Sequence, residues 1–141
     1  MGVFSFTGRV LFAFLFLSSG LQKIQHFNIV SGGPDMEHVE PKLDKFFAQV
    51  EELAGTKLPI GKVTYPYFLL IAILLELIGG LLFIFNSKLG AQFLLLFLVI
   101  VTPIMHAFWD LPASSPEQLN DIINFFKNTA LVGSLLIFLG A

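Results

Sequence analysis

Residues 68–85 read FLLIAILLELIGGLLFIF, a continuous apolar run that contains a single acidic residue, Glu76. A helix needs about 20 largely apolar residues to cross a bilayer, and this run nearly supplies them. A carboxylate at that depth costs about 2.5–3.5 kcal/mol on insertion scales, so it should face the protein and pair with another polar group. Gly79 and Gly80 lie one turn away, and small residues allow helix backbones to approach closely. The run therefore predicts a membrane-spanning helix whose Glu76 meets a partner at a close helix contact.

The composition of the chain is that of an integral membrane protein. Its 141 residues are 55% hydrophobic, including 17 Phe, and only 13% charged, with a mean hydropathy of +0.82. Soluble domains average about 45–50% apolar and about 25% charged residues, and a core this small cannot bury the excess. The chain has no Cys, which excludes disulfides and thiol redox chemistry within it, and we expect no metal site. Its net charge is -2, and the sequence has no cluster of basic residues of the kind that nucleic-acid binding needs, so we expect no nucleic-acid partner.

Hydrophobic periodicity and length divide the chain into four predicted spans and one long loop. The spans cover residues 6–27, 65–86, 89–110 and 119–141, and the hydrophilic loop covers residues 28–64. The first span is expected to be retained instead of being cleaved as a signal peptide. Short connections make neighbouring helices antiparallel, so both termini should lie on one face, the terminal side, opposite the loop side. We predict an all-α membrane protein, a single-domain four-transmembrane-helix bundle.

The long loop contains a predicted amphipathic helix over residues 41–54. Pro41 suits the first position of a helix, and Gly55 suits the position just past its end. Apolar residues recur between them at spacings of three and four, as on one face of a helix. This helix is expected to pack over the mouth of the bundle or to lie among the lipid headgroups. A docking surface for a partner protein is the alternative.

Depth in the bilayer suggests which residue pairs with Glu76. At 1.5 Å per residue, Glu76 lies roughly 16 Å from Tyr65 at the loop side, and Lys127 lies roughly 12 Å from Leu119 at the same side. The long stem of a lysine can cover the difference. We therefore predict an ion pair between Glu76 and Lys127.

Polar side chains of all four predicted spans lie in the loop-side half of the bundle, whereas the terminal-side half is almost purely apolar. One interpretation is that these groups fix the register of the helices through hydrogen bonds. Another is a polar pocket under the 41–54 helix that binds a quinone or a lipid headgroup, and a third is movement of ions or protons. The acidic residues Asp110, Glu117 and Asp121 are expected to form a solvated turn. The candidate ligand-binding cluster consists of Lys23, Glu76, His106, Asn124, Lys127 and Asn128.

Four segments of the chain resemble, in order, the successive segments of the DoxX-like family. They are GRVLFAFLFLSSGLQKI at 8–24, LLELIGGLLFI at 74–84, MHAFW at 105–109 and FFKNTALVGSLL at 125–136. The long hydrophilic insert after the first span resembles that of the HR-like lesion-inducing, plant-type branch. The resemblance implies a four-helix membrane bundle. It also implies a link to redox complexes, because some DoxX-like proteins are quinone-linked subunits and others associate with redox enzymes.

The favoured hypothesis is a non-enzymatic accessory or scaffold subunit of a larger membrane complex, such as a respiratory or redox complex. Its partners would be membrane lipids and other membrane-protein subunits, and its only cofactor would be a quinone or lipid held in the pocket. One alternative is a quinone-linked oxidoreductase component in which Glu76, His106 and Lys127 handle protons, and another is a small transporter or channel. The resemblance implies a multi-pass protein of the mitochondrial inner membrane or the endoplasmic reticulum.

Overall fold

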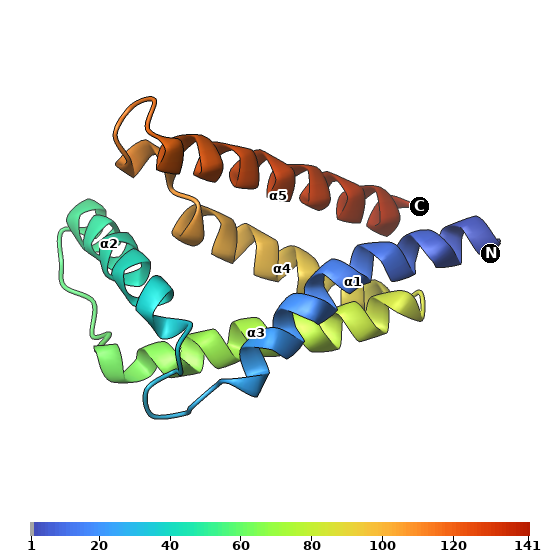
Figure 1. Cartoon of the computed structure of the whole chain (residues 1–141), viewed down its shortest axis with the longest axis horizontal. Coiled ribbons are helices and arrows are strands. Elements are labelled where there is room, and N and C mark those ends of the chain that lie inside the picture. Colours follow the sequence, from blue (N-terminus) through green and yellow to red (C-terminus); the bar gives the residue numbers. More distant parts are fainter. Residues whose placement is uncertain (1) are drawn as a thin grey trace.

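The computed structural model describes residues 2–141, and its regular elements are all helical. Four helical segments are long and apolar enough to cross a membrane, which confirms the predicted fold class. The N- and C-termini lie at the same end of the molecule, and α2 lies at the opposite end (Figure 1). The elements are α1 (Val3–Gln25), α2 (Met36–Ala54), η1 (Lys62–Thr64), α3 (Tyr65–Ile84), α4 (Lys88–Met105), η2 (Phe108–Asp110) and α5 (Pro116–Gly140).

Helix α3 is the central span, packed between α1 and α4, and α5 packs mainly against α4. Glycines make both contacts of α3 close. A Cβ atom at Gly80 would lie 3.0 Å from the Leu17 side chain of α1. On the other side, a Cβ atom at Gly90 of α4 would lie 2.5 Å from the backbone nitrogen of Phe83. The glycine pair of α3 thus serves two neighbours, since Gly79 faces α4 and Gly80 faces α1.

The four spans share one apolar core toward the terminal side. The rings of Phe83 on α3 and Phe138 on α5 lie 4.8 Å apart between centroids and hold these two helices together at that end. Van der Waals contacts between closely packed side chains such as these are a major source of attraction between helices in lipid. The buried members of this core are Ala13, Phe16, Phe83, Ala91, Leu94, Phe97, Leu98 and Leu135.

Helix α2 begins at Met36, earlier than the predicted residue 41, so Pro41 lies inside the helix. The first turn forms because carbonyl groups of the preceding turn accept its hydrogen bonds; Met36 N–H donates to Gly33 and Val39 N–H to Asp35. Pro41 lacks the N–H that would bond to the carbonyl of Glu37, and its ring crowds that carbonyl. At the other end Gly55 adopts the left-handed conformation, with φ of 72°, as is common after a helix.

The α-helix α4 ends at Met105, and the candidate membrane span continues through η2 to Asp110, where the predicted span also ends. Pro103 lacks a backbone N–H and therefore weakens the last turn. The chain leaves the helix at His106 and forms the short helix η2 before the turn into α5. Consequently α4 is an 18-residue helix, the shortest of the four spanning α-helices.

Candidate functional site: a cavity under helix α2

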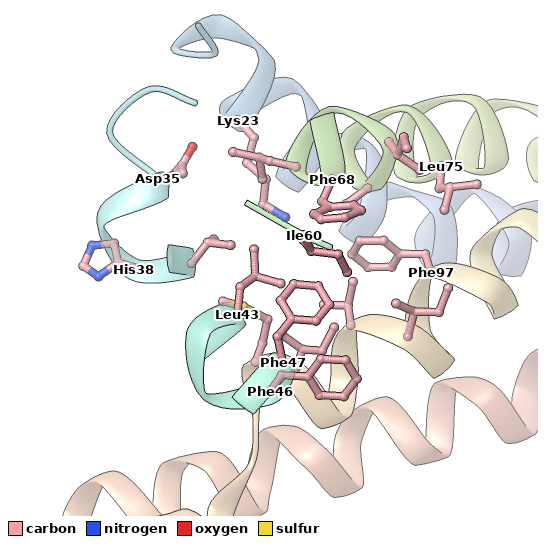
Figure 2. Close-up of a pocket in the computed structure, with 18 residues that line it drawn as sticks. Lys23, Asp35, His38, Leu43, Phe46, Phe47, Ile60, Phe68, Leu75 and Phe97 are labelled. Atoms are coloured by element: carbon pink, nitrogen blue, oxygen red, sulfur yellow. The ribbon is translucent and has the colours of Figure 1, made fainter. Parts of the chain in front are cut away.

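A cavity of about 500 Å³ lies where α2 covers the loop-side ends of α3 and α4. Figure 2 shows the rings of Phe46, Phe47, Phe68 and Phe97 gathered on one side of it, contributed by three helices. Asp35 and His38 lie at a different edge, near the beginning of α2 (Figure 2). Most of the remaining wall consists of Leu, Ile, Val and Ala side chains. The cavity is therefore an apolar space with polar groups at its edge, and not the polar pocket that the sequence suggested.

The apolar face of α2 closes one side of this cavity. Met36 and Leu43 are buried, and they belong to a second apolar core with Tyr65, Leu69 and Ile73 of α3. The ring of Phe47 stacks on that of Tyr65, with 5.9 Å between centroids. This face follows from the spacing of apolar residues in α2, which places them along one side of a helix.

The partner of Glu76 is Lys23 of α1, not Lys127. The Lys23 Nζ atom donates a hydrogen bond to Glu76 Oε1 at 2.9 Å, and Glu76 is only 2% exposed. Lys23 Nζ also lies 5.7 Å from the centre of the Phe97 ring, within cation–π range. The predicted pair was wrong because similar depth does not make two helices neighbours: α3 packs against α1, whereas α5 packs mainly against α4. Gly20 of α1 allows the close approach, since a Cβ atom there would lie 2.8 Å from Leu77.

The other predicted cluster residues lie apart from the Lys23–Glu76 pair, and three of them make separate hydrogen bonds or ion pairs. His106 Nδ1 lies 3.2 Å from Asp121 Oδ1, and Asn128 donates to the Thr102 hydroxyl at 3.1 Å. Asn124 donates to a carbonyl of its own helix, and Lys127 is exposed. Of the six residues in the predicted cluster, Lys23 alone lines the cavity. Asp121 is 9% exposed, which corrects the prediction of a solvated turn at this residue, whereas Glu117 is exposed as predicted.

A match to known proteins covers the whole chain, residues 1–141, and it is to the family described as HR-like lesion-inducing. The chain belongs to the HR-like lesion-inducing family. This confirms that part of the predicted resemblance. No solved structure matches the chain.

In this member of the HR-like lesion-inducing family, polar side chains of α2 that were not among the predicted site residues attach this helix to the spans. Gln49 donates to Asp110 Oδ1 at 2.9 Å, and Lys42 donates to the backbone carbonyl of Met105. The Tyr65 hydroxyl donates to Asp44 Oδ1 at 2.7 Å, which joins α2 to the beginning of α3. Long-range partners such as these cannot be recognised in one sequence, although their position on the polar side of an amphipathic helix is a weak signal.

The chemistry that these groups can perform is limited by their partners. The Glu76 carboxylate is occupied by the Lys23 ammonium group, and the His106 ring by Asp121. Within residues 2–141 no three His, Asp or Glu side chains lie close enough together to hold a metal ion. The arrangement is suited to binding an apolar molecule, with contacts to a polar headgroup at the edge of the cavity.

Proposed function

We propose that this chain is a non-catalytic accessory subunit of a larger membrane complex and that its cavity holds the apolar tail of a lipid or a quinone. The observation that carries the proposal is the cavity of about 500 Å³ under α2, with walls built from apolar side chains of α2, α3 and α4. Small-molecule sites typically have volumes of about 300–1,000 Å³ and mostly apolar walls with a few polar groups. The cavity matches that description.

The kind of occupant follows from the chemistry of the walls and the edge. Aromatic and branched aliphatic side chains favour an acyl or isoprenoid chain, because no polar partner is needed along its length. Lys23, Asp35 and His38 line the edge of the same cavity, and they offer both donors and acceptors to a headgroup. An amphiphile that enters from the membrane satisfies both requirements.

The separation of titratable side chains supports a non-catalytic role. Glu76 is paired with Lys23 between α3 and α1, whereas His106 is paired with Asp121 on α5. Glu76, His106 and Lys127 are absent from the cavity wall. The alternative of a quinone-linked oxidoreductase would need these three groups around one bound quinone, and the geometry does not favour it.

The four segments that resemble the DoxX-like family support a wider relationship, which we propose together with this role. Because some DoxX-like proteins are quinone-linked subunits, the relationship favours a quinone over a phospholipid as the occupant. It also favours an organelle membrane, either the mitochondrial inner membrane or the endoplasmic reticulum. The identity of the bound molecule would test both points.

Native mass spectrometry of the protein, released from its own membrane in mild detergent, tests the occupant directly. We expect a stoichiometric extra mass of a lipid or quinone on the natural protein. The variant Ala72→Phe fills the cavity from α3 and should lose that mass. Its matched control is Ala113→Phe in the turn before α5, an exposed position outside the cavity, which should keep it. A natural protein without a bound amphiphile, or an Ala72→Phe variant that retains it, would refute the cavity's role.

A further inference from the structure

Lys127 is a charged residue in the middle of α5 that has no ion pair or hydrogen bond through its side chain within the described residues 2–141. It lies roughly 17 Å from Pro116 and 20 Å from Gly140 along the helix axis, at a rise of 1.5 Å per residue. Even from Asp121, the last acidic residue of α5, Lys127 is roughly 9 Å deeper in the span. Its side chain is exposed, so in a bilayer it would face lipid.

A lysine at this depth is costly in lipid, and ionisable residues within spans almost always face protein or a water-filled space. Leaning toward the loop-side headgroups reduces the cost, because helical side chains point toward the N-terminus of their helix and α5 begins at the loop side. The length of the side chain does not remove the need for a counter-charge, because the Cα atom of Lys127 lies near the centre of the span. The position of Lys127 therefore favours contact with a counter-charge outside this chain.

The surface around Lys127 is suited to contact with another helix. Only 6% of the most apolar stretch of α5 is buried within the molecule, compared with 33% for the span that contains α3. Ala130 lies three residues after Lys127, and Ser134 lies four residues after Ala130; both are exposed. The Ser134 hydroxyl bonds to the Ala130 carbonyl of its own helix, so this surface presents little bulk. Small residues at such spacing let a second helix approach closely.

We propose that the outer face of α5, made of Lys127, Ala130 and Ser134, docks against a transmembrane helix of another subunit that carries an Asp or Glu at the depth of Lys127. The inference rests on the accessory-subunit role proposed above and names the chemistry of the partner. Charge complementarity selects that partner, since a buried ammonium group needs a carboxylate.

A second copy of this chain does not provide the required carboxylate. Glu76 is the one acidic residue in the interior of the four spans, because the others lie in the loops or near helix ends. Its carboxylate is buried and already bonded to Lys23 at 2.9 Å. A different membrane protein is therefore the occupant that the charges require.

Energy transfer in vesicles tests this proposal with a defined probe. The full chain, labelled with a donor dye, is reconstituted in phosphatidylcholine vesicles with an acceptor-labelled synthetic leucine-rich transmembrane helix that has one central Glu. We expect this helix to associate about tenfold more tightly than the same helix with Leu in place of Glu. Lys127→Leu should abolish the preference, and Ala130→Phe should weaken association by blocking close approach. Lys88→Leu, at an exposed lysine where α4 begins, is the matched control and should leave the preference unchanged.

Three results would overturn the proposal. The first is equal association of the Glu and Leu helices, and the second is a Glu preference that persists in Lys127→Leu. The third is energy transfer between copies of this chain that Lys127→Leu removes, because the occupant would then be a second copy. The cavity variant Ala72→Phe should associate with the Glu helix normally. Failure of the proposed ligand cavity, tested with Ala72→Phe, and failure of the proposed docking surface, tested with Lys127→Leu, can therefore be distinguished.

Discussion

Replacing Lys23 with methionine should destabilise the protein, because it leaves the carboxylate of Glu76 buried without a counter-charge. With an effective dielectric constant of about 20, two unit charges separated by 2.9 Å attract each other by about 6 kcal/mol. Desolvation of both groups offsets much of this attraction, and removal of one member of a buried pair typically costs about 3–5 kcal/mol. The Lys23 side chain is 29% exposed, which places the expected loss in the free energy of unfolding at the lower end, about 3 kcal/mol.

A double-mutant cycle measures this quantity. Lys23→Met, Glu76→Met and the double variant would be unfolded reversibly in detergent micelles or bicelles, and their free energies of unfolding compared. The double variant should be close to the natural protein in stability, because replacing both members of a buried pair with apolar groups is often neutral.

The matched control is Lys127→Met, the same substitution on another span. Lys127 is exposed and has no ion pair in the part of the chain that the structure describes. The free energy of unfolding of this variant should therefore lie within about 0.5 kcal/mol of that of the natural protein. A large loss in Lys127→Met together with a small loss in Lys23→Met would refute the assignment of Lys23 as the partner of Glu76. Additive losses in the double variant would show that the pair contributes no coupling.

Two further predictions concern helix packing and the attachment of α2. Gly90→Ala should lower the free energy of unfolding by about 1–3 kcal/mol, because the new Cβ would overlap the backbone of α3, whereas Gly133→Ala should not, since no atom lies within 4 Å of its added Cβ. Thermal unfolding of both variants in detergent would check this, and equal effects would contradict the packing argument. Asp110→Ala removes the partner of Gln49 and should speed amide hydrogen exchange in α2 while leaving exchange in α3 unchanged. Unchanged exchange in α2 would mean that its apolar face alone holds it in place.

The spans could be predicted from the sequence because their signal is local. A run such as residues 68–85 must be helical in lipid, whatever surrounds it, since only internal hydrogen bonds satisfy its backbone. The left-handed Gly55 at the end of α2 is predictable for a similar reason, because glycine adopts that conformation without a steric cost. These features depend on residues within a few positions of one another.

The features that could not be predicted depend on which helices are neighbours. The depth of Glu76 is readable from the sequence, but the choice between Lys23 and Lys127 depends on the order in which the helices pack. The burial of Asp121 depends on the position at which α4 ends, because that position places His106 beside the Asp121 carboxylate. The apolar nature of the cavity has the same origin. The polar side chains of the spans bond to one another between helices, so the wall of the cavity consists mainly of aromatic and aliphatic side chains.

The early end of α4 has a consequence for its contact with the surrounding bilayer. At 1.5 Å per residue, its 18 residues rise about 27 Å, and the candidate span reaches the roughly 30 Å of a typical hydrocarbon core only through η2, which ends at Asp110. Backbone that leaves the α-helix at membrane depth is tolerated only where protein or a water-filled space covers it. This end of the span lies at the loop side, where Lys42 of α2 bonds to the last carbonyl of α4. Helix α2 is therefore expected to shield the non-helical end of this span from the surrounding lipid.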